Sequence, residues 1–513
     1  MRNFIGDYIM SRSFVSGFLY VLTSKFGTLI LSVLITPIII RLLGSENYGN
    51  YAFVLSVITV LSLITSPGVS TGLRKYIAEN RDYSNWESLV FAFYFRVGIV
   101  LVTIASVSTI FLLYTGLVDP LIGSDVILYL YLGVVILIVR QLFSINKNAL
   151  RGLNREKYSD PLLILRKAMF GGVSVALIYV GWGVWGVLVG EILAVLLASI
   201  IAIFFLRRDL DLSYVAKLTP SNFPRRDLLS YNFSNMLFMA MLGSLYQFDI
   251  LLMNPLAGSE QTGYYKGALV IAEFLWFVPL AVQTMLVHST SELWLNGKTE
   301  KISSIASKVT RYTILFTSLL AIGLISLVDD FVPLYLGQDF SNSIKPLLLL
   351  IPGAIGLAAA RPILSIGQAK GNMRLLILAT GFATFLNISL NIYLIPRYGM
   401  NGAAIATSIS YGSMFFFHLF SAHRLGFYPL KDLRLSRILG TVILTAVPLL
   451  LLSNLIDSTV ASLVFIPPIG FCIYSFSAIK LNAISIDEIN RILDGCPDPL
   501  RRYGRIFLQK LES

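Results

Sequence analysis

The sequence predicts an all-α polytopic membrane protein with about fourteen transmembrane helices, arranged as two six-helix lobes plus a C-terminal helix pair. Three observations support this fold class. Hydrophobic residues make up 56% of the chain and charged residues only 13%, against roughly 25% charged residues in soluble proteins. Long apolar runs recur along the chain, and a helix of about 20 apolar residues crosses the hydrocarbon core of a bilayer. One short motif occurs twice at the ends of such runs.

The apolar runs predict helices rather than a membrane barrel, because barrel strands would give alternating segments of roughly ten residues. The first run follows Arg2 and Arg12 and lacks a cleavage site, so we expect an uncleaved helix. The predicted spans are residues 15–40, 48–70, 88–114, 126–146, 160–180, 184–206, 229–253, 264–287, 312–336, 345–367, 374–395, 402–423, 436–453 and 459–480.

Lysine and arginine predict the orientation of these spans. Thirty-one of the forty basic residues lie in loops on the side of the N-terminus, and three lie in loops on the opposite side. Basic residues accumulate on the cytoplasmic side of membrane proteins. We therefore expect a multi-pass protein of the cell membrane with both termini in the cytoplasm. Orientation also accounts for the formal net charge of +12 without nucleic acid as a partner.

A turn motif indicates an internal repeat. Residues 44–51 read GSENYGNY and residues 258–265 read GSEQTGYY; likewise, GVWG at 183–186 returns as GMNG at 399–402. Six predicted spans separate each pair, so both copies have the same orientation, as in a parallel repeat. Glycines here suit positive φ and close helix approach. We expect lobes at 1–214 and 215–430, a helix pair at 431–480, and a cytoplasmic tail at 481–513 with amphipathic helices at 484–495 and 500–511 on the membrane surface.

Two of these segments resemble a known family. Residues 35–79 and 246–268 are similar to the starts of the two lobes of polysaccharide-transporter flippases, within the multidrug/oligosaccharidyl-lipid/polysaccharide exporter superfamily. The resemblance covers roughly residues 10–425 and implies a V-shaped transporter that moves lipid-linked oligosaccharides to the outer leaflet. By the same resemblance, the final two helices form a groove for the polyprenyl tail; a dimer or packing surface is the alternative.

Polar residues form a stripe on the first predicted span. Lys25, Thr28 and Ser32 fall on one helix face, just before Pro37. An ionised side chain at the centre of a bilayer costs at least about 2.5–3.5 kcal/mol, so it faces a partner or a wet cavity. We interpret Lys25 as the most central cation of the chain.

Arg96 in the third span and Arg361 in the tenth are further cations within the spans. Arginine suits bidentate phosphate contacts, and lysine acts as a point charge. We hypothesise that Lys25, Arg96 and Arg361 hold the phosphates of a lipid-linked substrate. The alternative is that both arginines extend to the cytoplasmic interface, while Lys25 pairs with Asp249 or Glu273 to fix helix packing.

Four more residues complete the candidate substrate site: Asp249, where the resembling family commonly carries an acidic residue, Glu273 in the eighth span, and Asn387 and Asn391 in the eleventh. In the resembling fold, spans 1, 7 and 8 begin or flank the lobes, which implies that these polar groups line one central cavity. Glu191 is isolated within the sixth span; we expect satisfied packing, with proton coupling as the alternative. Two cysteines and three histidines lack disulfide or metal-ligand spacing, so we predict no cofactor, metal or catalytic residue.

The leading hypothesis is a flippase for a polyprenyl-phosphate or polyprenyl-diphosphate oligosaccharide, which works by alternating access in cell-surface polysaccharide biosynthesis. Its expected partners are the lipid-linked oligosaccharide, membrane lipids and polysaccharide polymerase machinery. The second hypothesis is a cation-coupled multidrug exporter of the same superfamily, which would favour an anionic cavity. An enzyme would need paired carboxylates at a membrane face, and helix-end solvation explains the one outward pair, Asp329 and Asp330. A scaffold protein would not depend on the cations within the spans.

Overall fold

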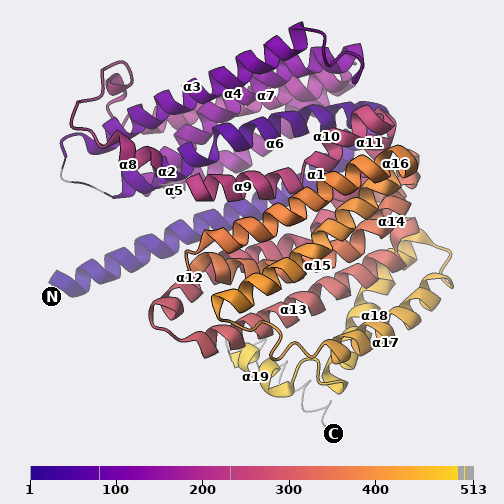
Figure 1. Ribbon diagram of the computed structural model, residues 1–513. Helices are drawn as coiled ribbons and strands as arrows, with labels where there is room; N and C mark the ends of the chain where they lie inside the picture. The colour runs from indigo at the N-terminus through magenta and orange to yellow at the C-terminus, as the bar shows by residue number, and fades with distance from the viewer. Residues whose placement is uncertain (1, 80, 82, 231–232, 495–501, 503–513) are drawn as a thin grey trace. The chain divides into compact units, whose positions relative to one another are not determined.

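The described residues fold into α-helices and short 3₁₀ turns joined by loops (Figure 1). The structure is a computed structural model that describes residues 2–79, 81, 83–230, 233–494 and 502, and no strand occurs among them. The elements are α1 (Arg2–Thr65), α2 (Pro67–Ala78), α3 (Trp86–Tyr114), α4 (Ser124–Gly152), α5 (Glu156–Ser159), α6 (Pro161–Tyr179), α7 (Gly183–Leu206), η1 (Leu212–Val215), α8 (Arg225–Ser230), α9 (Phe233–Leu245), α10 (Phe248–Ala257), α11 (Ser259–Ala272), η2 (Glu273–Trp276), α12 (Phe277–Leu295), α13 (Thr299–Ser326), α14 (Val328–Leu336), η3 (Gln338–Ser343), α15 (Ile344–Ala369), α16 (Met373–Leu425), α17 (Leu435–Ser453), α18 (Thr459–Lys480) and α19 (Ile486–Asp494).

The predicted all-α polytopic fold is confirmed. Within the described ranges, 12 helical segments are long and apolar enough to cross a membrane. Two of these segments each contain two predicted spans. α1 leaves the helical conformation at Gly44 (φ 71°, ψ 174°), and α16 does so at Gly399 (φ 55°, ψ −135°). Glycine adopts positive φ at little cost, so each segment divides there into two helices, in agreement with the sequence.

The chain forms two compact units. Unit 1 comprises Met1–Leu269, Tyr335–Pro346 and Met373–Ser410, and unit 2 comprises Val270–Leu334, Leu347–Asn372 and Tyr411–Ser513. These units gather segments that are far apart in the sequence. The division into lobes at residues 214 and 215 rests on the repeat alone and stays a prediction.

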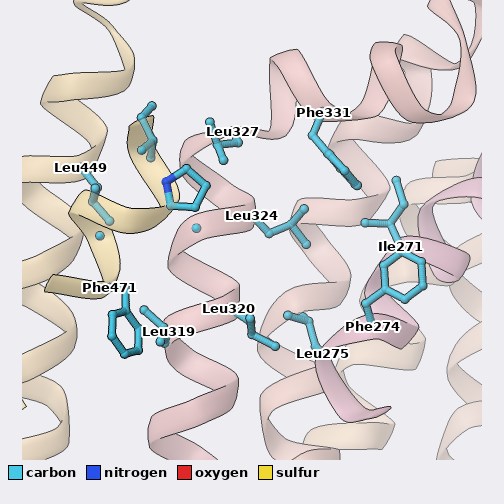
Figure 2. Close-up of a pocket in the computed structure, with 14 residues that line it drawn as sticks. Ile271, Phe274, Leu275, Leu319, Leu320, Leu324, Leu327, Phe331, Leu449 and Phe471 are labelled. Carbon is cyan, nitrogen blue, oxygen red and sulfur yellow. The ribbon is translucent and has the colours of Figure 1, made fainter. Parts of the chain in front are cut away.

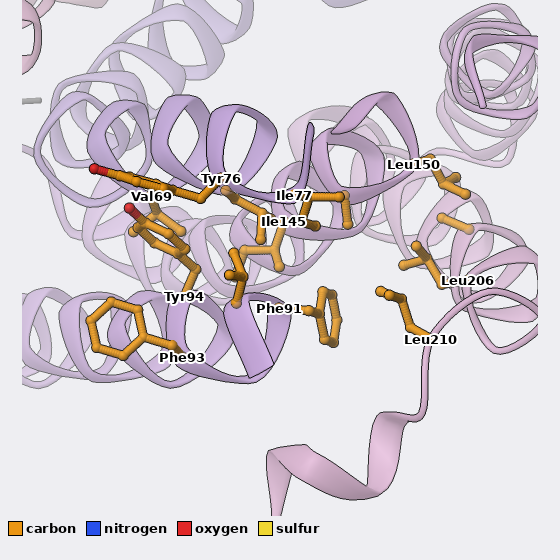
Figure 3. Close-up of a cluster of buried hydrophobic side chains, with 14 of the residues drawn as sticks. Val69, Tyr76, Ile77, Phe91, Phe93, Tyr94, Ile145, Leu150, Leu206 and Leu210 are labelled. Atoms are coloured by element: carbon orange, nitrogen blue, oxygen red, sulfur yellow. The ribbon is translucent and has the colours of Figure 1, made fainter. Parts of the chain in front are cut away.

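The core of unit 1 lies between closely packed helices. α6 packs along α7, and α4 packs against α7 and α2. Gly190 allows the first of these contacts, because a Cβ there would lie 2.3 Å from the hydroxyl oxygen of Ser174. Figure 3 shows a buried cluster to which α2, α3, α4 and α7 contribute, including Tyr76, Phe91 and Leu206.

The two copies of the turn motif contact each other within unit 1. A Cβ on Gly49 would lie 1.8 Å from the carbonyl oxygen of Ser259. Reciprocally, a Cβ on Gly263 would lie 1.9 Å from the carbonyl oxygen of Ser45. No other residue type fits this approach without a backbone shift, so the glycines of the motif serve helix contact as well as turning.

Two predicted spans are interrupted. The seventh breaks at Tyr246 and Gln247, between α9 and α10, and the eighth passes through the 3₁₀ turn η2 between α11 and α12. Broken helices at membrane depth need side chains or a cavity to satisfy their backbone groups. The Ser56 hydroxyl donates to the side-chain oxygen of Gln247 at 2.9 Å, which holds α1 at this break.

In unit 2, α13 packs against α12, α17 and α18. The fully buried Arg311 of α13 donates to the carboxylate of Asp432 at 2.9 Å and to that of Glu488 in α19. These bonds attach the first predicted tail helix to the end of the bundle. The second, residues 500–511, lies outside the described residues apart from residue 502.

Candidate functional site

The polar stripe on α1 lies near one end of unit 1. The Thr28 hydroxyl donates to the carbonyl oxygens of Ser24 (2.8 Å) and Lys25 (3.0 Å). Lys25 is exposed and Ser32 is half-buried. The Ser24 hydroxyl donates to the carbonyl oxygen of Asp160, immediately before α6, at 2.9 Å. Lys25 therefore lies level with the start of α6, which the charge pattern assigns to the cytoplasmic end; its expected central position in the span is wrong.

Asp249 and Asn387 lie in one buried polar cluster formed by α10, α11 and α16, and the buried Asn391 lies about one helical turn from Asn387. The fully buried carboxylate of Asp249 accepts hydrogen bonds from the hydroxyls of Tyr265 and of Thr407, the latter at 3.3 Å. The side-chain nitrogen of Asn387 donates to the hydroxyl oxygen of Thr407 at 3.4 Å. The side-chain nitrogen of Asn391 donates to the backbone carbonyl oxygen of Asn387 at 2.9 Å. The break before α10 and the two halves of α16 thus meet around one carboxylate.

Oxygen atoms dominate this cluster. The side-chain oxygens of Asn387 and Asn391 are buried and, in the described part of the chain, accept no hydrogen bond. Such atoms cost free energy, so they call for a ligand or another explanation. Carboxylate, amide and hydroxyl oxygens are ligands that hard cations prefer. The cluster can therefore hold a cation or a proton. Asp249 is bonded to hydroxyls here, and Lys25 is not its partner.

The sequence did not indicate Tyr265 and Thr407 as members of this cluster. Tyr265 is the last residue of the second turn motif, which alone suggests turn chemistry. Thr407 lies in an apolar run without a charged neighbour. The helical spacing of Asn387 and Asn391 marked their face of the first half of α16, but nothing in the sequence marks the facing residue on its second half.

Glu191 is not isolated, in contrast to its appearance in the sequence. Its carboxylate accepts from Nε and Nη2 of Arg140 at 2.9 and 2.8 Å, and Nη1 of Arg166 lies 3.9 Å away. The charge count groups Arg140 with a cytoplasmic loop, whereas α4 continues to Gly152 and places this arginine within the helix. The ion pair joins α4, α6 and α7 and satisfies the buried carboxylate.

Arg96 in α3 anchors a loop of unit 1. Its guanidinium donates to the carbonyl oxygens of Tyr214 (2.6 Å), Val215 (3.1 Å) and Lys217 and to the hydroxyl of Thr219 (2.8 Å). A phosphate would have to replace these partners, and each hydrogen bond contributes about 1 kcal/mol. This geometry favours the interface role of Arg96 over a phosphate contact.

Arg361 and Glu273 belong to unit 2. Arg361 in α15 is 4% exposed, and its Nη1 donates to the side-chain oxygen of Gln283 in α12 at 2.8 Å. Glu273 is exposed at the first residue of η2. The remaining predicted site residues belong to unit 1, so a single cavity that unites all of them stays a prediction.

Unit 2 also contains an apolar cavity of about 370 Å³. Figure 2 shows Phe274, Phe331 and Phe471 among the side chains around it. Gly323 of α13 and Gly470 of α18 add space to it because they have no side chain. The walls come from α11, η2, α13, α14, α17 and α18, and the lining residues are Ile271, Phe274, Leu275, Leu319, Leu320, Gly323, Leu324, Leu327, Phe331, Leu449, Ile466, Pro467, Gly470 and Phe471.

Comparison with known proteins identifies a family and a fold. Residues 14–276 match the family model described as polysaccharide biosynthesis protein. A membrane protein of Methanocaldococcus jannaschii is 23% identical over an alignment of 474 residues that covers 87% of this chain and 91% of that protein. The probable low-salt glycan biosynthesis flippase Agl15 of Haloferax volcanii is 21% identical over an alignment of 375 residues that covers 72% of this chain and 75% of that protein.

Solved structures share the fold. The lipid II flippase MurJ in an inward closed conformation has a TM-score of 0.73 at 14% identity and covers 90% of this chain and 98% of its own. An inward-facing multidrug resistance transporter of the MATE family has a TM-score of 0.63 at 16% identity and covers 77% of this chain and 94% of its own. At these identities the likeness concerns the fold.

Proposed function

The chain belongs to the polysaccharide biosynthesis protein family, and from this premise we propose that it is a flippase for lipid-linked oligosaccharides. Its substrate is an oligosaccharide on a polyprenyl phosphate or diphosphate, and it moves that lipid from the cytoplasmic to the outer leaflet by alternating access. The similarity to a glycan biosynthesis flippase and the fold shared with a lipid II flippase support this proposal.

The apolar cavity in unit 2 carries the proposal. Its volume of about 370 Å³ lies in the range of small-molecule sites, and apolar residues with two glycines line it throughout. Such a lining cannot bind a sugar or a phosphate, but it can bury part of a polyprenyl chain. Two of its walls, α17 and α18, belong to the predicted additional helix pair. We therefore assign the lipid tail to this cavity.

Cations on the spans suit the head group. Lys25 is exposed at the level where α6 begins, where a substrate from the cytoplasmic leaflet would enter. Arg361 carries a buried guanidinium in unit 2. We propose that these two residues make the first contacts with the phosphates. Arg96 is proposed to make a weaker phosphate contact, because its guanidinium is already hydrogen-bonded to the loop. Thr28, Ser32, Glu273 and the asparagine face of α16 are proposed to contact the sugars.

The cluster around Asp249 suits energy coupling. It joins α10, α11 and both halves of α16 through buried oxygen atoms. A cation or proton bound there would change the balance of charge at the broken seventh span, and differential binding between two states shifts their equilibrium. We propose that this cluster binds the coupling ion.

A cation-coupled multidrug exporter is the alternative function, because a MATE transporter shares the fold. An exporter of organic cations needs a carboxylate that its substrate can reach. Asp249 is fully buried and hydrogen-bonded, and Glu191 pairs with Arg140. Glu273 is the predicted site carboxylate that is exposed, so the preference for the flippase rests on the family match and the apolar cavity.

The site of action follows from the charge pattern. We propose the cell membrane as the location, with both termini in the cytoplasm, because the basic loops lie on the side of the N-terminus. The product would then reach the outer leaflet, where polysaccharide polymerase machinery is the proposed partner.

The test is transbilayer movement of a polyprenyl-diphosphate oligosaccharide in proteoliposomes, scored by access of an added glycosidase. We expect protein-dependent movement, reduced roughly tenfold in Lys25→Ala because a charge-assisted phosphate contact is lost. Lys301→Ala is the matched control, since Lys301 is also an exposed helical lysine. Absence of movement, together with ion-driven efflux of an organic cation, would establish the exporter instead.

A further inference from the structure

A tyrosine compensates for a proline in α1. Pro37 lies within this helix, after the polar stripe. Proline has no N–H, so it cannot bond the carbonyl oxygen of Val33, four residues earlier. An unpaired carbonyl oxygen is costly inside a membrane. The hydroxyl of Tyr335 donates to this oxygen at 3.0 Å and so supplies the donor that the helix lacks.

The contact between Tyr335 and Val33 is one of several that attach residues 335–346 to α1 and α11. Residues Tyr335–Pro346 belong to unit 1, although the residues on both sides of them belong to unit 2. Within this segment, the Phe340 ring packs edge-on against Tyr48 with 6.2 Å between centroids. The Ser343 hydroxyl donates to the carbonyl oxygen of Tyr264 at 2.8 Å. The segment thus holds α1 and α11 at several points.

α14 connects this attachment to the apolar cavity. It carries Tyr335 and, four residues earlier, Phe331, which lines the cavity in unit 2. Residues four apart lie on the same face of a helix. Figure 2 shows the Phe331 side chain directed toward the cavity. One short helix therefore has one aromatic residue at the cavity and another at the weak point of α1.

We propose that α14 couples occupancy of the apolar cavity to the conformation of α1, with Tyr335 as a positioning residue that latches the carbonyl oxygen released by Pro37. A lipid tail that moves Phe331 moves Tyr335 with it, because both belong to α14 and lie four residues apart, on either side of Pro333. Release of the latch frees α1 to bend at Pro37 and reorients its polar stripe toward the head group. The coupling rests on the proposed function, whereas the latch does not.

A double-mutant cycle tests the latch on the free protein. Hydrogen exchange of residues 33–43 is measured in wild type, Tyr335→Phe, Pro37→Ala and the double variant. We expect roughly tenfold faster exchange in Tyr335→Phe, since a half-buried acceptor loses its donor. Tyr335→Phe should have no effect on exchange when it is added to Pro37→Ala, because the alanine of that variant supplies the helical N–H that the proline lacks. Equal effects in both backgrounds would overturn the latch.

Tyr474→Phe is the matched control. The Tyr474 hydroxyl also donates to a helix carbonyl oxygen, that of Leu315, at 2.8 Å. Four residues later stands Leu319, which has an N–H of its own to donate. We therefore expect this variant to leave exchange at residues 33–43 unchanged, and a change there would overturn the assignment to Tyr335.

Geranylgeranyl diphosphate tests the coupling. Its addition should slow exchange at residues 316–331, which include much of the cavity wall, and alter exchange at residues 33–43. In Tyr335→Phe only the cavity should respond. A cavity response without an α1 response in wild type overturns the coupling. Absence of any cavity response overturns the tail site and the coupling with it, while the cycle above still decides the latch.

Discussion

Asp249 is the residue whose environment bears most directly on energy coupling. Asp249→Asn keeps the size and the acceptor for Tyr265 but removes the charge that a cation needs. We expect the wild-type protein to gain thermal stability in sodium chloride relative to choline chloride, because a ligand that binds only the folded state stabilises it, by about 2.7 kcal/mol at a hundred times Kd. The asparagine variant should gain none, measured as Tm at equal ionic strength.

Asp209→Asn is the control for this substitution. Asp209 also forms a hydrogen-bonded pair, with Arg155 at 2.7 Å, but on the exposed surface. Its variant should keep the wild-type response to sodium. Coupling by sodium would be excluded if Asp249→Asn responded as strongly as wild type, and a shift of the transport pH profile in that variant would then indicate a proton.

Residue types could be predicted from the sequence better than residue positions. Asp249 and Asn387 are polar groups in apolar runs, and the structure brings both to Thr407. Lys25 is also a polar residue in an apolar run, but it lies level with the start of α6. α1 begins at Arg2, well before the first predicted span at residue 15. Hydropathy measures the length of an apolar run and contains no information about where neighbouring helices end.

At the scale of elements, the apolar runs predicted the spans, whereas the interruptions were not predictable. Gly44 and Gly399 divide α1 and α16 at turns that the motif marks. The break at Tyr246 and Gln247 has neither glycine nor proline. A partner on a distant segment, Ser56, satisfies a side chain there, so this break is a tertiary feature.

The attachment of α19 makes stability depend on pH. Burial raises the pKa of Glu488, but the backbone N–H of Ser485 and the nearby Arg311 lower it by more, so its pKa lies below the usual value. A carboxyl with a depressed folded pKa contributes stability above its unfolded pKa, about 4.3, and loses that contribution as pH falls through the folded pKa. The Tm difference between wild type and Glu488→Gln should therefore be largest near pH 7 and shrink below about pH 4.3.

Asp487→Asn separates this pair from the general effect of acid. Asp487 is exposed on the same helix, so its variant should follow the wild-type Tm across the whole range. A Tm difference for Glu488→Gln that stays constant from about pH 7 to about pH 3.5 would contradict the assigned role of the ion pair with Arg311.

At the scale of the whole molecule, the sequence predicted where the long apolar helices lie but not which segments pack into one unit. Apolar length determines the first property. The second depends on contacts such as that between Gly49 and Ser259, which join positions far apart in the chain. Residues 335–346 illustrate the limit, since they belong to unit 1 between two segments of unit 2 and no local pattern marks them.

Transport depends on the whole molecule, and one added side chain in unit 2 tests whether the lipid tail enters it there. Gly323 lines the apolar cavity, and a Cβ at this position would meet nothing within 4 Å. Gly323→Leu therefore starts its side chain in open space and should fill part of the cavity, and leucine is also the better helix former. Gly172→Leu, a helical glycine in open space outside the cavity, is the matched control. We expect the first variant to retain its Tm but to flip the polyprenyl-linked substrate at least about tenfold more slowly, because the tail loses its apolar site, while the control flips at the wild-type rate. Equal rates for both variants would remove the tail from this cavity and leave the head-group contacts to account for substrate binding.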